Sequence, residues 1–351
     1  MTSSYPFKNL VFRGGGIKSF AYHGVLYVLE EEGILPQIAR VAGTSAGAVT
    51  ATLVSFRRPV EETVGLFRTL DFKAVPKKRS KITDEWLLPI PSGLEASLGK
   101  VMGNVEAMNR LLQKYGLYSY DYSHAWMQQV IGRYCDGNER ATFAEFQARG
   151  FRDLYVVTTN LNRHQEQIFS AAETPDVAVA DALVLSQAIP LFFEAPRFDG
   201  AKLGTGDIYV DGGIVNDYPL QIFDQPKPFA EDNPWFISEI NWETLGCRLF
   251  TPDDCPDPGY HLPIDSLIGY ISNLLETIMN NQIEAHRQRL VDQLRSVDVN
   301  DCCVQATDFD IRPEDDDETY CELLAKGRQA ATDYLAAYQP PDQNGHRPTA
   351  R

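Results

Sequence analysis

Two consecutive strand, turn and helix units near the start of the chain constrain its fold more than any other feature. In the first, the apolar residues 8–12 end at the glycines of "RGGGIKS", and residues 19–32 follow with the apolar spacing of a helix. In the second, residues 38–42 lead into "GTSAG", and residues 46–56 predict another helix. Successive units of this kind predict an α/β fold with a mostly parallel sheet.

Later segments continue the α/β pattern. Residues 153–161 and 166–170 predict a pair of strands, and residues 208–210 predict a short strand that ends at Asp211. Thr174 is expected to cap a helix that starts at the following proline and stops before the next one.

The sequence predicts a catalytic core, a C-terminal part and a tail. The core is expected over residues 6–225, with residues 57–150 inserted as a cap; residues 226–338 either complete the core or form a helical lobe. That second part contains an amphipathic pattern over 264–295 and a last helix near 317–338, and residues 339–351 are expected to be disordered.

Composition excludes several classes of protein. The chain has 351 residues and a formal net charge of −16, which disfavours binding to nucleic acid. It shows neither a signal peptide nor an apolar run that could span a bilayer, so a cytoplasmic location is expected. Any contact with membranes is expected to be peripheral. The six cysteines have no metal-ligand spacing, which argues against a zinc site, and reduced thiols are expected.

One basic stretch departs from the acidic composition. It contains Lys77, Lys78, Arg79 and Lys81, and it is followed by Trp86 in "WLLPIP". A solvated loop is the favoured interpretation, and contact with a lipid headgroup layer is the alternative.

The motif GxSxG is formed by Gly43, Ser45 and Gly47. A serine on a sharp turn between a strand and a helix exposes its hydroxyl, and the following helix N-terminus favours developing negative charge. Ser45 is therefore the predicted nucleophile.

The glycine stretch predicts an oxyanion hole. Gly14, Gly15 and Gly16 can turn successive amides toward one point, and Lys18 adds positive charge nearby. A nucleotide-binding loop is the disfavoured alternative, because Ser19 replaces the last glycine of that pattern and no acidic residue ends a second strand.

The catalytic base is expected to be Asp211. None of the six histidines stands in the glycine-flanked position at the end of a strand that a triad partner occupies. Asp211 ends a predicted strand and precedes Gly212 and Gly213, although an Asp-Gly pair also fits a simple turn.

These motifs together resemble the patatin-like phospholipase family. The resemblance covers residues 8–220 and rests on "RGGGIKS", "GTSAG", "DGG" and "SQAIPLFF" in this order. It implies a three-layer α/β/α sandwich and acyl ester hydrolysis by a Ser45–Asp211 dyad that needs no metal or other cofactor. Ser19 and Arg13 depart from the family pattern.

The resulting hypothesis is a phospholipase A or lysophospholipase that acts on phospholipid or lysophospholipid. An acyltransferase with the same dyad and a catalytically silent lipid-binding regulator are the alternatives. The inserted residues 57–150 are expected to form the entrance for the acyl chain.

Overall fold

The structure, a computed structural model, describes residues 5–75, 105–230, 233–252, 255 and 289–341, together with 273–274, 277–278, 281–282 and 286. For residues 105–108 and 226–227 only the backbone is described. The basic stretch from Lys77 to Trp86, most of the helix expected over 264–295 and nearly all of the expected tail lie outside these residues.

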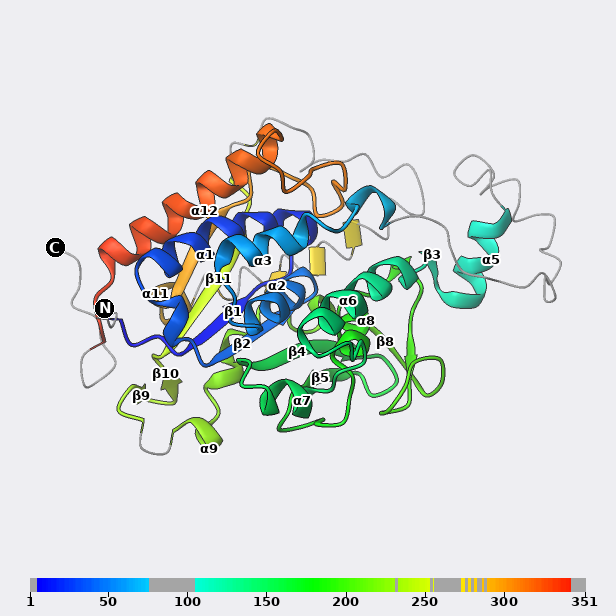
Figure 1. The fold of residues 1–351 in the computed structure, drawn as a ribbon, viewed down its shortest axis with the longest axis horizontal. Helices are drawn as coiled ribbons and strands as arrows, with labels where there is room; N and C mark the ends of the chain where they lie inside the picture. Colours follow the sequence, from blue (N-terminus) through cyan, green and yellow to red (C-terminus); the bar gives the residue numbers. More distant parts are fainter. Residues whose placement is uncertain are drawn as a thin grey trace.

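A mostly parallel sheet forms the centre of the described structure (Figure 1). Its strand order is β12-β11-β1-β2-β4-β8-β7, with β5 also paired to β4. The strands from β12 to β4 run parallel, whereas β5, β7 and β8 pair antiparallel. The strands are β1 (Asn9–Phe12), β2 (Arg40–Thr44), β4 (Asp153–Asn160), β5 (Gln165–Phe169), β7 (Arg197–Phe198), β8 (Asp207–Asp211), β11 (Thr244–Phe250) and β12 (Ser296–Asn300).

Helices precede or follow most of these strands. They are α1 (Ala21–Glu31), α2 (Ala46–Ser55), α3 (Val60–Phe67), α5 (Val105–Lys114), α6 (Asp121–Tyr134), α7 (Phe143–Ala148), α8 (Val179–Ser186), α9 (Pro226–Phe229), α11 (Leu290–Leu294) and α12 (Glu318–Ala337). Two small two-stranded sheets join β3 (Gly116–Tyr118) to β6 (Leu191–Phe193) and β9 (Phe236–Ile237) to β10 (Ile240–Asn241). In the described residues no helix combines the length and the apolar character that crossing a bilayer requires.

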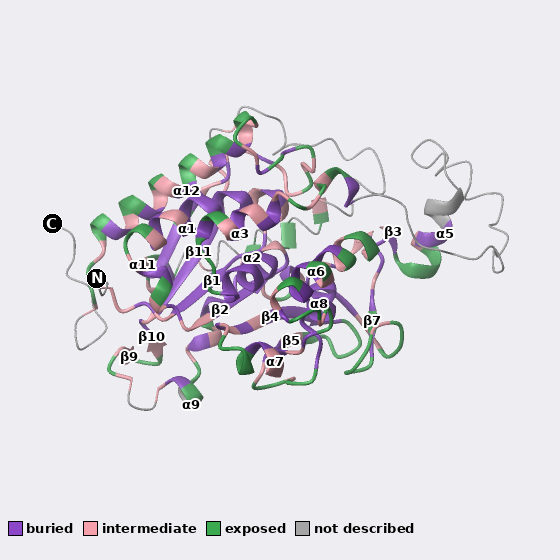
Figure 2. Cartoon of the chain, in the orientation of Figure 1, coloured by how far each residue is buried: buried purple, intermediate pink, exposed green. Residues whose placement is uncertain are grey.

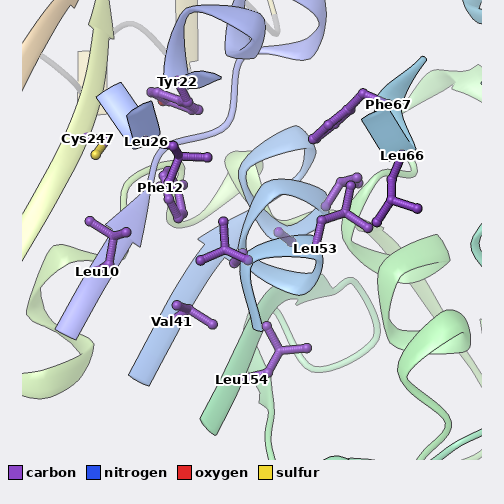
Figure 3. Packing of buried hydrophobic residues seen from close by; sticks show 14 of the residues in the cluster. Leu10, Phe12, Tyr22, Leu26, Val41, Leu53, Leu66, Phe67, Leu154 and Cys247 are labelled. Carbon is purple, nitrogen blue, oxygen red and sulfur yellow. The ribbon is translucent and has the colours of Figure 1, made fainter. Parts of the chain in front are cut away.

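The central strands are covered on both faces. Because side chains alternate along a strand, Leu10 and Phe12 of β1 enter one hydrophobic cluster and Val11 enters another. The larger cluster includes residues of α1, α2, α3 and α12, and Figure 3 shows Leu10 and Phe12 within it. The smaller cluster contains Tyr218, Leu220 and side chains near α9. The burial colours of Figure 2 accordingly place the central strands inside the protein.

The helices α1 and α12 pack side by side over the larger cluster (Figure 1). Their backbones approach closely at Gly24 and Gly327, where a Cβ added to Gly24 would lie 2.0 Å from the carbonyl oxygen of Leu324. The expected last helix is confirmed as α12, and its cap is Asp317, whose side chain accepts a hydrogen bond from the amide of Tyr320.

The helix expected from Thr174 onward begins later, at Val179. The preceding carbonyls are used elsewhere: those of Pro175 and Val177 accept hydrogen bonds from the amides at the start of α7. This pairing keeps the segment before α8 out of the helix.

The expectation that all cysteines are reduced is wrong for one pair. Cys255 and Cys303 form a disulfide across a sequence separation of 48 residues. Cys135 and Cys247 are buried free thiols, as expected. The spacing of Cys255 and Cys303 gave no sign of their pairing, because the pairing depends on where β11 and β12 end.

Candidate active site

The strand registers bring the two predicted catalytic residues together. Along one edge of β4, Val157 pairs with Thr44 of β2, and the next residue, Thr158, pairs with Asp211 of β8. Ser45 directly follows Thr44, so it lies beside Asp211 at the point along β4 where pairing with β2 ends and pairing with β8 begins. The contact therefore follows from the sheet topology.

Ser45 lies on a sharp turn between β2 and α2. Its φ is +54°, an unfavourable value for a residue with a side chain. Gly43 and Gly47 allow this turn to pack tightly: a Cβ on Gly43 would lie 2.3 Å from the carbonyl oxygen of Gly47, and one on Gly47 would lie 2.5 Å from that of Arg13. The side-chain hydroxyl of Ser186 accepts a hydrogen bond from the Ser45 amide at 2.8 Å and donates to the carbonyl of Val157 at 2.7 Å.

The hydroxyl of Ser45 donates a hydrogen bond of 2.5 Å to the carboxylate of Asp211. Asp211 is 1% exposed, and its other carboxylate oxygen accepts from the amide of Gly213 at 2.8 Å. Its backbone is fixed as well, since Thr159 donates to its carbonyl and its amide donates to the carbonyl of Ala188. A base so placed can take the proton of the Ser45 hydroxyl directly.

Burial raises the pKa of Asp211 from its ordinary 3.8 to about 7. The hydrogen bonds from Ser45 and Gly213 lower the pKa, and the nearby charge of Asp217 raises it further. The carboxylate is therefore a far stronger base than an exposed aspartate while it is still partly ionised near neutral pH.

The glycine loop lies next to this pair, but its amides are not equivalent. Gly14 donates to the carbonyl of Asp217 at 3.0 Å, which removes it from the predicted set of oxyanion donors. Within the described part of the chain, the amides of Gly15 and Gly16 have no hydrogen-bond acceptor. The ammonium of Lys18 lies 2.8 Å from Asp301, so it is held by that carboxylate.

Ser19 and Arg13, the two residues that depart from the expected glycine pattern, each interact with a neighbouring group. Ser19 keeps a negative φ, and its hydroxyl donates to the carbonyl of Gly16 at 2.7 Å, so it fits the loop without strain. Arg13 forms a buried ion pair with Asp217, with its Nε atom 2.6 Å from the carboxylate.

None of the four histidines in the described residues hydrogen-bonds to Ser45 or Asp211. His23 is fully buried beside Tyr320, and burial lowers its pKa to about 3. His124 and His286 pair with aspartates of their own, Asp181 and Asp292. In this part of the chain, the titratable side chain that hydrogen-bonds to the Ser45 hydroxyl is therefore that of Asp211.

An apolar pocket opens against Ser45, Ala46 and Gly16. About 890 Å³ of space around it is free of atoms, part of this being open to solvent. Its wall includes Phe20, Phe67, Leu70, Trp126, Met127 and Phe309. No charged side chain is found among the described residues that line it.

The sequence model of the patatin-like phospholipase family matches residues 10–224 of the chain. The chain belongs to the patatin-like phospholipase family. The match includes the glycine loop, the Ser45 turn and the segment after Asp211, and it ends before β11, β12 and α12.

Three similar proteins place this patatin-like chain among its relatives. An uncharacterized protein of Acanthamoeba polyphaga mimivirus is 26% identical over 63% of the chain and 63% of its own length, so the chain spans less than two thirds of that relative. A probable lipid hydrolase of Invertebrate iridescent virus 6 is 31% identical over 23% of the chain and 26% of its own length. The crystal structure of VipD from Legionella pneumophila has the same fold, with a TM-score of 0.56 and 16% identity over 96% of the chain and 68% of VipD.

Several residues of this patatin-like site were given no role by the sequence. Ser186 begins the stretch "SQAIPLFF", but its hydrogen bond to the Ser45 amide depends on the packing of α8 against the Ser45 turn. Asp301 and Phe309 lie in the loop between β12 and α12, far from every motif. Asp217 stands six residues after Asp211, outside the "DGG" motif.

Proposed function

We propose that this chain is a serine lipid acyl hydrolase of the phospholipase A or lysophospholipase type, with Ser45 as nucleophile and Asp211 as general base. One observation carries the proposal: the Ser45 hydroxyl donates to the buried Asp211 carboxylate at 2.5 Å, and Ser45 also lines the apolar pocket. The family membership supports lipid as the substrate class.

The reaction has two steps. Asp211 takes the proton of Ser45 as its oxygen attacks the ester carbonyl of the lipid, and the alcohol part of the ester leaves with a proton. An acyl group is then attached to Ser45. Asp211 next takes a proton from water, which attacks this acyl-enzyme and releases the fatty acid and the free serine.

The negative charge that develops on the ester carbonyl oxygen during the reaction must be stabilised by hydrogen-bond donors. The amides of Gly15 and Gly16 are uncommitted in the described structure, and so is the amide of Ala46 at the first turn of α2. Gly16 and Ala46 line the pocket beside Ser45. We therefore assign the oxyanion hole to these amides. In other enzymes, removing a single donor of this kind lowers the rate about 10²–10³-fold.

The pocket suits the acyl chain of the substrate. An uncharged wall of aromatic and aliphatic side chains favours a hydrocarbon chain over a charged headgroup. Part of this wall, including Phe67, Trp126 and Met127, comes from the region between residues 57 and 150. This origin supports the hypothesis that the inserted region guides the acyl chain.

The proposal is tested by labelling with a fluorophosphonate and by fatty-acid release from mixed phospholipid vesicles. The variants are Ser45→Ala, Asp211→Asn and, as a matched control, Ser123→Ala, which removes another pocket serine. Labelling and release by the wild type, their loss in Ser45→Ala, a strong reduction in Asp211→Asn and normal activity of Ser123→Ala would support the dyad.

Folded wild-type protein that neither labels nor releases fatty acid would refute the proposal and favour a silent lipid-binding protein. Labelling of Ser45→Ala would show that another residue is the nucleophile. Adding a long-chain alcohol to the vesicles separates acyl transfer from hydrolysis, since a transferase would form a new ester in place of the free acid.

A further inference from the structure

Residues 216 and 217 lie where the three sequence motifs of the site meet. They follow Asp211 by a few residues, after a short 3-10 turn at Gly212–Ile214. The carbonyl of Asn216 accepts a hydrogen bond from the hydroxyl of Thr44 at 2.8 Å, and the carbonyl of Asp217 accepts from the amide of Gly14 at 3.0 Å. This segment therefore touches both the Ser45 turn and the glycine loop.

The side chain of Asp217 adds an ion pair to these backbone contacts. Its carboxylate is fully buried and lies 2.6 Å from Nε of Arg13, whose own guanidinium also donates to the carbonyl of Leu249 at 2.7 Å. Tyr22 donates to the carbonyl of Arg13 at 3.0 Å. Both ends of the pair are thus held by several neighbouring elements.

Asp217 also lies directly against the glycine loop. A Cβ added to Gly14 would lie 2.4 Å from Oδ1 of Asp217, so the loop passes over the carboxylate without space for a side chain. This Oδ1 atom is buried and has no hydrogen-bond partner in the described residues. A buried carboxylate costs free energy unless it is paired, and here Arg13 is its partner.

We propose that Arg13 and Asp217 are positioning residues, whose ion pair fixes the glycine loop against the segment that carries Asp211 and thereby sets the distance from the oxyanion donors to Ser45. The inference rests on the proposed function. It assigns a role to Arg13, which departs from the family pattern, and identifies Asp217 as its partner.

The pair also affects the electrostatics of the dyad. Burial is the main cause of the raised pKa of Asp211, and the negative charge of Asp217 raises this pKa further. Removing the Asp217 charge while keeping its shape is therefore expected to lower the pKa of Asp211. An ion pair whose charges do not act on Asp211 would have no such effect.

The test depends on the charges around the Arg13–Asp217 pair. Burial raises the pKa values of the neighbouring Tyr22, Tyr218 and Cys247, so these groups stay neutral near pH 7. Charged or titratable groups on adjoining elements include Glu166, bound to Asn216, and the Lys18–Asp301 ion pair on the glycine loop. They also include the Arg248–Asp298 ion pair of β11 and β12 and His286, whose ring packs against Tyr218 and which pairs with Asp292. All of these are kept unchanged in the variants below.

The experiment measures kcat, KM and the pH profile of fatty-acid release for Asp217→Asn and Arg13→Lys. Asp217→Asn is expected to lower kcat at least tenfold with little change in KM, because oxyanion contacts are made in the transition state and a 1 Å misplacement costs about 10²-fold. The midpoint of its acid limb is expected to move to lower pH. Arg13→Lys keeps the charge but loses the guanidinium geometry, so kcat should fall without a shift of the acid limb.

Asp224→Asn is the matched control. Asp224 forms another ion pair with a buried arginine, Arg295, and lies in the segment that follows η6 (Leu220–Phe223), outside the site. Its loss is expected to lower the stability while leaving kcat and the pH profile of the folded protein unchanged.

An Asp217→Asn variant that behaves like Asp224→Asn, with normal kcat and an unshifted acid limb, would overturn the inference. If Asp217→Asn does not fold, Arg13→Lys decides: normal kcat in that variant would also overturn it. Failure of the proposed function is distinguishable, because the wild type itself would then be inactive.

Discussion

Replacing Asp211 with asparagine is expected to stabilise the folded protein at neutral and alkaline pH. Burial raises the pKa of Asp211 from 3.8 to about 7, so the folded protein holds this proton more tightly than the unfolded chain does. The stabilisation from the protonated carboxyl is complete below pH 3.8 and is lost as the pH rises to about 7.

The magnitude follows from the difference in pKa. At 1.36 kcal/mol for each pKa unit, the ionised Asp211 costs the folded state about 4 kcal/mol above pH 7, and about 2 kcal/mol at pH 5.5. Asparagine at this position does not titrate, so the free energy of unfolding of Asp211→Asn relative to wild type should increase by these amounts. A weaker hydrogen bond to Ser45 in the variant would change its free energy of unfolding by the same amount at every pH, so the dependence on pH would remain.

The assay is urea unfolding of both proteins, followed by tryptophan fluorescence at several values from pH 5 to pH 8. Asp199→Asn is a control that should lower the free energy of unfolding instead of raising it. Hydrogen bonds from the backbone amides of Lys202 and Ala201 lower the pKa of the exposed Asp199 to about 2, so its ionised form stabilises the folded protein. A stability difference between Asp211→Asn and wild type that is the same at pH 5 and pH 8 would refute the reasoning.

Three further outcomes are expected. The kcat/KM for fatty-acid release should fall about tenfold for each pH unit below 7, because only ionised Asp211 can accept the Ser45 proton; a rate that stays constant from pH 5 to 8 would argue against Asp211 as the base. Gly24→Ala should lower the free energy of unfolding, measured in urea, by about 1–3 kcal/mol, since its Cβ would lie 2.0 Å from a carbonyl of α12. Gly65→Ala, whose Cβ would meet no atom within 4 Å, should raise it by up to about 1 kcal/mol in the same assay. Replacing Cys255 with serine should cost about 4 kcal/mol, the loop-closure entropy of a disulfide that spans 48 residues; equal stability of the variant and the oxidised wild type would contradict this expectation.

The sequence predicted the parts of the fold that depend on local patterns. The strands that became β1, β2, β4, β5 and β8 were placed within about two residues of their observed bounds. The turn at Ser45 was predictable as well, since GxSxG between a strand and a helix is typical of a sharp turn that exposes the serine. These features are encoded by neighbours along the chain.

The parts that were missed depend on contacts between distant residues. No local signal indicates that β11 and β12 lie next to β1, or that Cys303 reaches Cys255. The hydrogen bonds of the glycine amides could not be predicted for the same reason: the amide of Gly14 donates to the carbonyl of Asp217, which lies 203 residues later (217 − 14). Sequence spacing suggested three equivalent donors, and tertiary packing made them different.

The position of β1 has a consequence for how the protein is made. β1 lies between β2 and β11, and its first residue, Asn9, pairs with Thr244, while Ile17 in the turn after the glycine loop donates to the carbonyl of Ala306. At about 5–20 residues per second, a ribosome needs on the order of 10–50 s between synthesising the two partners of β1. Ser45 thus emerges early, but the strand and loop beside it gain their contacts with Thr244 and Ala306 only after these later residues have been made. We expect the site at Ser45 to be completed only once residues through Ala306 have emerged from the ribosome.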